Sequence, residues 1–162
     1  MFRICARAVT APRLRGRVTT FWRMLGDAQA TVLELFAAFA ARDAEAAEAV
    51  LHPDLEFYPQ PTGELAERRE PYRGHAGFRR YLSDVERVWE EFSVTPADFR
   101  VAGAGVICFG HATGRPRGTA EVRRVPVIWV FRLRDGRVVF CRVARTAAEA
   151  TELAAAPDVA AG

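Results

Sequence analysis

The hydrophobic pattern of this chain changes its period at Ser93, and this change constrains the fold more than any other feature. Before it, apolar residues recur at spacings of three and four, as on one face of a helix, most clearly over residues 78–92. After it, apolar and polar residues alternate, as in strands with one buried face. Helices followed by a run of antiparallel strands predict an α+β fold in which helices pack on one face of a curved sheet.

Turn and capping residues divide this pattern into elements. A first helix is expected from about Ala28 to Ala40, and Asp43 is a favourable N-cap for a short second helix over 44–51. Pro53 should end that helix, because the residue before a proline disfavours α geometry. Asp135-Gly136 predicts a hairpin. The other expected elements are a strand at 55–59, a loop at 60–73, a third helix at 75–92, strands near 94–102, 105–114, 121–134 and 137–145, and a last helix at 147–155.

The charge of the chain is distributed unevenly. Residues 1–26 contain six arginines and no acid, whereas residues 27–162 contain 17 arginines and 20 acids. The body is therefore slightly acidic, without the basic stripe that binds nucleic acid. We expect residues 1–27 to be a basic, disordered extension, 28–155 to be one domain and 156–162 to be a disordered tail. The extension is open to three interpretations: an import sequence, a basic tail for an anionic partner, or an upstream extension of a reading frame that starts at Met24.

The absence of two residue types excludes two classes of functional site. The 162 residues include no lysine and no asparagine, which excludes Schiff-base chemistry and a P-loop, since both use a lysine amine. Codons for both residues are rich in A and T, so their absence points to a GC-rich, bacterial genome. No apolar run approaches the ~20 residues that cross a membrane. Cys5, Cys108 and Cys141 have no paired spacing, so we expect reduced thiols in a cytoplasmic protein.

The order of motifs is similar to that of a known family. The segments "HPDLEFYP" (52–59), "YRGHAGF" (72–78) and "RDG" (134–136) resemble recurrent motifs of SnoaL-like domains over about residues 28–155. These domains belong to the nuclear-transport-factor-2-like superfamily, with ketosteroid isomerase, polyketide cyclases, scytalone dehydratase and limonene epoxide hydrolase. The resemblance implies a cone-shaped α+β barrel: a curved, mostly antiparallel sheet with three helices of the N-terminal half on its concave face. It also implies a deep apolar pocket and a homodimer formed through the sheet.

The resemblance does not extend to the known catalytic residues. Ketosteroid isomerase uses an aspartate base and an oxyanion hole made by a tyrosine and a protonated aspartic acid. These positions fall on Pro59, Leu35 and Trp129, and none of these side chains can transfer a proton. A shift of one residue brings in only Glu34, at the tyrosine position. The acids of SnoaL-type cyclases and of limonene epoxide hydrolase are not reproduced either, because the strand that would hold them offers only Glu121.

These observations predict an apolar pocket that binds a small hydrophobic or aromatic molecule, without a cofactor. The residues expected to line or rim it are Phe57, Tyr58, Tyr72, Trp89, Trp129 and Arg145. A first alternative is a cofactor-independent cyclase, isomerase or dehydratase that uses Glu56 or His75 as its acid or base. A second alternative is a structural dimerisation module without an internal cavity. The three histidines are scattered, with no convergent cysteine or acid spacing, so no metal site is predicted.

Overall fold

The protein folds as an α+β domain, as the change of hydrophobic period predicts. The structure, a computed structural model, describes residues 17–157. The predictions for the basic extension and the tail therefore fall wholly or partly outside the described residues. The elements in chain order are α1 (Arg17–Ala40), α2 (Ala44–Val50), β1 (Leu51–Tyr58), α3 (Thr62–Leu65), β2 (Tyr72–Arg73), α4 (Gly74–Val88), β3 (Trp89–Ala102), β4 (Gly105–Pro116), β5 (Arg123–Arg134), β6 (Arg137–Ala144) and α5 (Ala147–Ala155).

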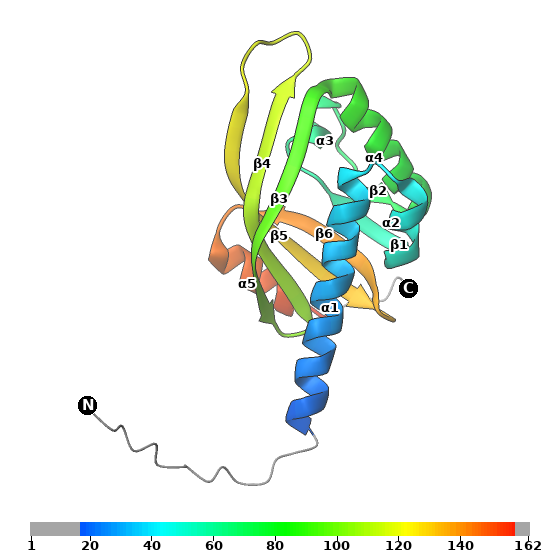
Figure 1. Ribbon diagram of the computed structural model, residues 1–162, viewed down its shortest axis with the longest axis vertical. Helices are drawn as coiled ribbons and strands as arrows, with labels where there is room; N and C mark the ends of the chain where they lie inside the picture. The colour runs from blue at the N-terminus through cyan, green and yellow to red at the C-terminus, as the bar shows by residue number, and fades with distance from the viewer. Residues whose placement is uncertain (1–16, 158–162) are drawn as a thin grey trace, which may run out of the picture.

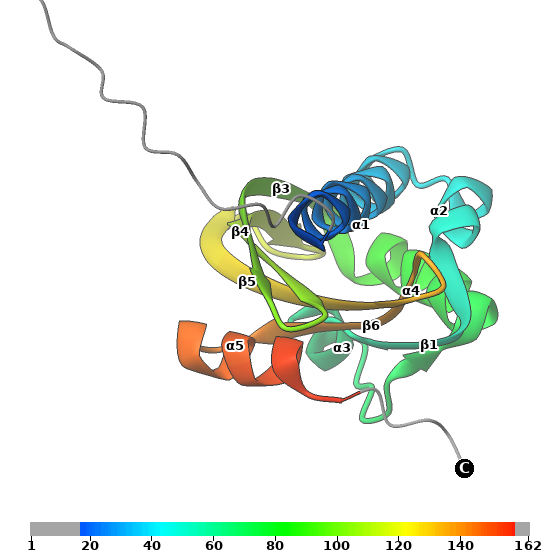
Figure 2. The ribbon, with the colours of Figure 1, turned by 90° about the horizontal axis from the view of Figure 1, so that it is seen from below.

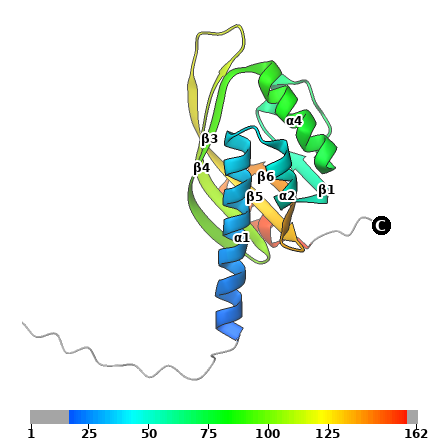
Figure 3. The same ribbon diagram turned by 45° about the vertical axis from the view of Figure 1, so that its right-hand side comes forward.

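The strands form one six-stranded sheet in the order β2-β1-β6-β5-β4-β3. β1 and β6 run parallel, whereas every other neighbouring pair is antiparallel. The sheet curves strongly without closing (Figures 1 and 3). Seen from below, α1, α2 and α4 cover its concave side and α5 lies on the opposite side (Figure 2). The expected cone with helices on the concave face is confirmed.

The apolar residues form two separate clusters on the two faces of the sheet. The larger cluster fills the concave side and includes Val32, Leu55 and Phe131, each at most 2% exposed. The smaller cluster packs Ala150 and Ala154 of α5 against Val130 on the convex side. Strand β5 is therefore covered on both faces over its middle, which explains why its apolar run does not alternate.

The end of the long helix differs from the sequence prediction. Helix α4 ends at Val88, and the expected last turn belongs to β3. Trp89 and Phe92 have helical spacing in sequence, yet their rings stack at 4.7 Å between centroids within the strand. A register shift between Trp89 and Glu91 explains this, because one extra residue brings positions three apart onto the same face of a strand.

The strand expected at 55–59 begins earlier than the sequence predicts. Strand β1 begins at Leu51, so the proline lies inside it. The pairing of β1 with β6 skips from Leu51 to Glu56, which leaves the exposed proline outside the ladder, where its missing N–H costs nothing. The expected loop at 60–73 also contains the short helix α3 and strand β2. Helix α1 begins at Arg17, before the boundary expected at Ala28.

None of the helices within residues 17–157 is long and apolar enough to cross a lipid bilayer. Cys108 and Cys141 are buried free thiols, whereas Cys5 lies outside the described residues. A cytoplasmic location and a homodimer formed through the sheet stay predictions.

Gly110 allows β3, β4 and β5 to approach closely, which generates a testable expectation. A Cβ at this position would lie 2.1 Å from the carbonyl oxygen of Thr95 and 2.9 Å from the Trp129 ring. We expect Gly110→Ala to lower the free energy of unfolding by about 1–3 kcal/mol, as overpacking does. Gly63→Ala is the control, because the nearest atom there is the Arg68 carbonyl oxygen at 4.0 Å. Urea denaturation measures both variants, and equal stabilities would contradict this account.

Candidate functional site

An apolar cavity of about 50 Å³ lies between the concave face of the sheet and its covering helices. Its walls come from α1, β1, α4, β3, β5 and β6, so it sits where six elements converge. The lining residues are Leu35, Phe36, Phe39, Leu51, Leu55, Phe57, Phe78, Tyr81, Val94, Trp129, Phe131 and Cys141. The deep ligand pocket that the resemblance implies stays a prediction, and this cavity is the candidate for it.

Aromatic rings shape most of the wall. Phe36 of α1 meets Trp129 and Phe131 edge-on, with centroid distances of 5.2 and 5.8 Å. On the other side, Phe57 and Tyr81 meet edge-on at 4.6 Å. Edge-to-face packing is favourable because the positive edge of one ring faces the negative face of the other. Phe36 is only partly buried, so it is the aromatic wall residue of α1 that is closest to solvent.

Two wall residues, Tyr81 and Cys141, carry ionisable groups, and neither acts as a base at neutral pH. Burial raises the pKa of the Tyr81 hydroxyl well above its ordinary value, and the nearby Thr62 hydroxyl offsets only part of this rise. Burial also raises the pKa of the Cys141 thiol. Both groups therefore stay protonated: the phenol can donate a hydrogen bond, and the thiol is a poor nucleophile. The lining residues include no carboxylate, imidazole or guanidinium.

Phe57 and Trp129 line the cavity, as the sequence analysis expects. Trp89 does not line the cavity. The residue is 8% exposed, and its Nε1 donates a 3.0 Å hydrogen bond to Thr62 Oγ1. This bond ties the start of β3 to α3, a helix that the sequence pattern does not reveal. Trp89 is therefore a core residue whose polar atom is already satisfied.

Tyr58 and Tyr72 line a different, more polar pocket of about 180 Å³ near α3 and the end of β1. The Tyr58 hydroxyl donates to Glu56 Oε2 at 3.1 Å. Tyr72 is only 2% exposed, and burial, reinforced by a hydrogen bond to Asp84, raises its pKa to about 12. Neither tyrosine lines the apolar cavity itself, but Phe57 lines both spaces, so the tyrosines belong to a neighbouring pocket.

Asp84 of α4 is a buried carboxylate that the sequence analysis does not single out. Its Oδ2 accepts a 2.7 Å hydrogen bond from the Tyr72 hydroxyl, and its Oδ1 accepts one of 3.0 Å from Arg87. Arg68 lies 3.4 Å from Oδ2 and covers the Tyr72 ring. Burial alone would raise the pKa of Asp84, but these hydrogen bonds and positive charges lower it overall. The network joins α4 to β2 outside the cavity.

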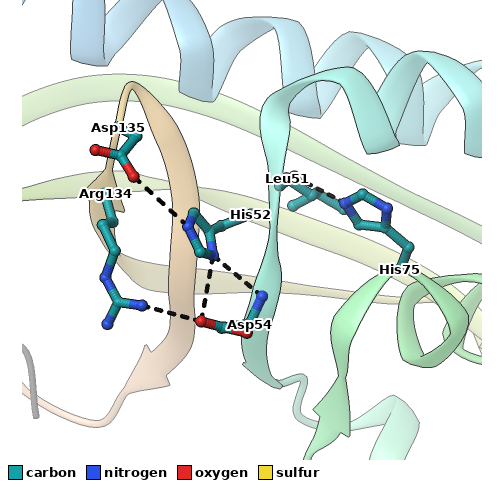
Figure 4. A network of polar contacts seen from close by, with 6 residues as sticks. All are labelled: Leu51, His52, Asp54, His75, Arg134 and Asp135. Atoms are coloured by element: carbon teal, nitrogen blue, oxygen red, sulfur yellow. Dashed lines mark hydrogen bonds and ion pairs between the residues drawn. The ribbon is translucent and has the colours of Figure 1, made fainter. Parts of the chain in front are cut away.

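The two acid-base candidates of the enzyme hypothesis do not line the cavity. Glu56 is held by an ion pair with Arg73 and by the Tyr58 hydroxyl. His75 begins α4, and its Nε2 lies 2.9 Å from the carbonyl oxygen of Leu51, within hydrogen-bond distance (Figure 4). Both side chains therefore hold the edge of β1 to its neighbours.

A second polar cluster lies at the other side of β1. His52 Nδ1 accepts a 3.1 Å hydrogen bond from the backbone N–H of Asp54, and its Nε2 faces Asp135 on the β5–β6 turn (Figure 4). Arg134 pairs with Asp54 at 3.2 Å.

Arg145, expected at the rim of the cavity, is instead exposed and pairs with Glu149 of α5 at 3.3 Å. Over the described part of the chain, no group of three or more His, Cys, Asp or Glu side chains could hold a metal ion.

Comparison with known proteins gives one family and several structural relatives. A model of the SnoaL-like domain matches residues 32–141, more than half of the chain. TerC, co-crystallized with polyporic acid, is 25% identical with a TM-score of 0.64, and the match covers 80% of this chain and 99% of TerC. A nuclear-transport-factor-2-like protein from Burkholderia pseudomallei is 22% identical with a TM-score of 0.65, covering 80% and 98% of the two chains. An epoxide hydrolase from M. tuberculosis is 18% identical with a TM-score of 0.58, covering 80% and 90%. No curated protein matches the sequence.

The Asp84 network makes the stability of the protein depend on pH in a defined direction. We expect Asp84→Ala to lower the free energy of unfolding by about 3 kcal/mol at pH 7, because Tyr72 and Arg68 lose their buried partner. The folded-state pKa of Asp84 is lowered, so its contribution is present above the ordinary aspartate pKa of 3.8 and is lost as the pH falls through the folded value. The difference between wild type and variant should therefore shrink below this range.

Denaturant unfolding across the pH range measures this difference. Asp98→Ala is the control, because Asp98 pairs with Arg100 at 3.7 Å on the surface, where an ion pair contributes about 0–1 kcal/mol. A difference for Asp84→Ala that grows on acidification would contradict the assignment.

Proposed function

Because the chain belongs to the SnoaL-like domain family, we propose that it binds a small hydrophobic or aromatic molecule in the apolar cavity under α1 and α4. The observation that carries the proposal is the composition of the wall: ten of its twelve lining residues have purely hydrocarbon or indole side chains, and the other two are Tyr81 and Cys141. Binding sites for small molecules are mostly apolar with a few placed polar groups. TerC, a relative at 25% identity, was co-crystallized with a small organic molecule, which agrees with this use of the fold.

The cavity must widen to accept an aromatic ligand. Its volume is about 50 Å³, whereas an apolar cavity that holds benzene has roughly 150 Å³. Phe36 supports such widening, because it is partly exposed on the covering helix and contacts Trp129 and Phe131 by ring edges alone. Rotation of this ring towards solvent would enlarge the cavity without breaking a hydrogen bond.

Within the widened cavity, Trp129 and Phe57 would pack against the ligand and Tyr81 would orient it. The phenol keeps its proton, because burial raises its pKa, so it can donate a hydrogen bond to a carbonyl or hydroxyl group. Catalysis by acid or base would need a group that the wall does not hold, since Glu56 and His75 lie elsewhere. A ligand site without acid-base machinery is thus the function that the geometry supports best.

Filling the cavity should abolish binding. We expect 4-phenylbutanol to bind the wild-type protein in isothermal titration calorimetry and Cys141→Leu to weaken the affinity at least about tenfold, because the larger side chain occupies the space. Val143→Leu is the matched control, since it places leucine on the same strand outside the cavity walls. Circular dichroism checks that both variants fold. Absence of binding to the wild type, or equal affinities for the three proteins, would refute the proposal.

The Tyr81 hydroxyl should distinguish ligands that accept a hydrogen bond. We expect Tyr81→Phe to weaken the binding of 4-phenylbutanol by about five- to tenfold, the effect of one lost hydrogen bond. Butylbenzene, which has the same ring and no oxygen, should bind both proteins equally. A loss of affinity that is the same for both compounds would show that Tyr81 acts through packing alone.

A further inference from the structure

A groove of about 420 Å³ lies between the first half of α1 and the turns β3–β4 and β5–β6. Its lining residues are Asp27, Ala28, Thr31, Val101, Gly103, Ala104, Gly105, Val106, Leu133, Asp135 and Gly136. We infer that this groove is the mouth of the apolar cavity and that the ligand is an elongated molecule with an apolar body and a protonated amine at one end. The inference rests on the proposed function and adds to it the entrance and the chemistry of the ligand head.

The groove has the size that the cavity lacks. Pockets for small molecules occupy roughly 300–1,000 Å³, and the groove falls within this range whereas the cavity, at about 50 Å³, does not. An apolar ligand therefore has room in the groove before any side chain moves. The exposed side chain of Val101 and the half-buried one of Leu133 give this space apolar walls.

The groove and the cavity lie next to each other under the same helix. On α1, Ala28 and Thr31 line the groove, and Leu35 and Phe36, one to two turns further on, line the cavity. On β5, the walls pass likewise from Leu133 in the groove to Phe131 in the cavity. These residues belong to one continuous apolar cluster, except for Thr31 at the solvent side.

A thin partition separates the two spaces. Val106 lines the groove and is paired across strands with Phe131, which lines the cavity. Paired residues of neighbouring antiparallel strands have side chains on the same face, so these two side chains stand side by side between the spaces. Phe36 meets the Phe131 ring edge-on at 5.8 Å from above. A ligand that passes from the groove into the cavity would therefore have to displace the Val106 and Phe131 side chains.

The charges at the groove indicate the head group. Among the described residues that line the groove, two are aspartates, Asp27 and Asp135, and none is arginine, although the chain contains 23 arginines. The Asp135 carboxylate lies 3.8 Å from His52 Nε2 (Figure 4), which is longer than a hydrogen bond, so it can accept one from a ligand. The Thr31 hydroxyl donates to the carbonyl oxygen of Asp27 at 3.0 Å, so the carbonyl oxygen of Gly136, 3.4 Å from the same hydroxyl, is a further acceptor. An ammonium group, with three donors and a positive charge, complements this set.

The length of the ligand follows from the helix. Ala28 and Phe36 are eight residues apart on α1, a distance of about 12 Å at 1.5 Å per residue. A phenyl ring on a four-carbon chain covers most of this distance, so a ring at the cavity would bring its head into the groove near Asp27 and Asp135. The test uses three compounds with this body: 4-phenylbutylamine, 4-phenylbutanol and 4-phenylbutyrate.

The first experiment measures the preference for the charged head by isothermal titration calorimetry at pH 7. We expect the amine to bind about five- to tenfold more tightly than the alcohol, since two exposed carboxylates each contribute a modest attraction, and the carboxylate compound to bind most weakly. The double variant Asp27→Asn/Asp135→Asn should lose the preference for the amine and keep its affinity for the alcohol. Asparagine suits position 135, where the backbone φ is 51°. Asp98→Asn, outside the groove, should behave as wild type.

The second experiment tests the entrance. Ala28→Phe places a ring in the groove, whereas Ala37→Phe places the same ring on the exposed face of the same helix. We expect Ala28→Phe to slow association of 4-phenylbutanol, measured by stopped-flow tryptophan fluorescence, at least about tenfold, and Ala37→Phe to leave it unchanged. Equal rates in both variants would overturn the assignment of the groove as the mouth.

The two proposals fail in different ways. One outcome is that Cys141→Leu weakens binding of the alcohol while the wild type binds the amine no more tightly than the alcohol. The cavity is then a ligand site, and the inference about the head group is wrong. The same holds if the double variant keeps the preference for the amine. If neither compound binds the wild type, both proposals are refuted.

Discussion

The covering of the concave sheet face by α1 and α4 is the constraint on which the rest of the structure depends. The concave face of this sheet is apolar, and without covering helices it would be exposed to water. Phe131, Leu55 and Val138 are nearly inaccessible because helices lie over them. The curvature in turn needs close approach of the strands, and Gly110 permits it where a Cβ would meet the neighbouring backbone. The cavity is the space that the side chains leave unfilled between these helices and the sheet.

The buried carboxylate of Asp84 and the buried indole N–H of Trp89 form their hydrogen bonds away from the cavity. Asp84, Tyr72 and Arg68 form one network at the edge of the sheet, and Trp89 bonds to Thr62 nearby. These bonds fix α3, β2 and the ends of α4 around the apolar centre. The cavity itself keeps a hydrocarbon wall with a single phenol and a single thiol. The separation of a rigid polar frame from an apolar interior is what makes ligand binding a better account of the site than acid-base catalysis.

The proposed entrance would add a chemical preference that the apolar wall of the cavity cannot supply. An apolar wall selects ligands by size and shape, and one extra methylene changes affinity only modestly. Charges at the mouth act on a different part of the molecule. The aspartates of the groove, in a chain rich in arginine, would favour a positively charged head and disfavour an anionic one. The cavity would thus select the apolar part of a ligand, and the groove would select its charged end.

The sequence by itself determined the class of fold, the order of its longer elements and the lack of acids at the positions that match those of the isomerase. Hydrophobic period and turn residues are local, so the switch after α4 and the Asp135-Gly136 hairpin could be seen in the chain alone. The register shift that turns Trp89 into a strand residue could not, because a helical spacing of apolar residues also fits a bulged strand. Nor could the sequence place Tyr81 in the cavity, Tyr58 and Tyr72 outside it and Arg145 against α5. Which face a strand residue presents, and what lies opposite it, depends on pairing partners distant in sequence, and only the tertiary structure decides that.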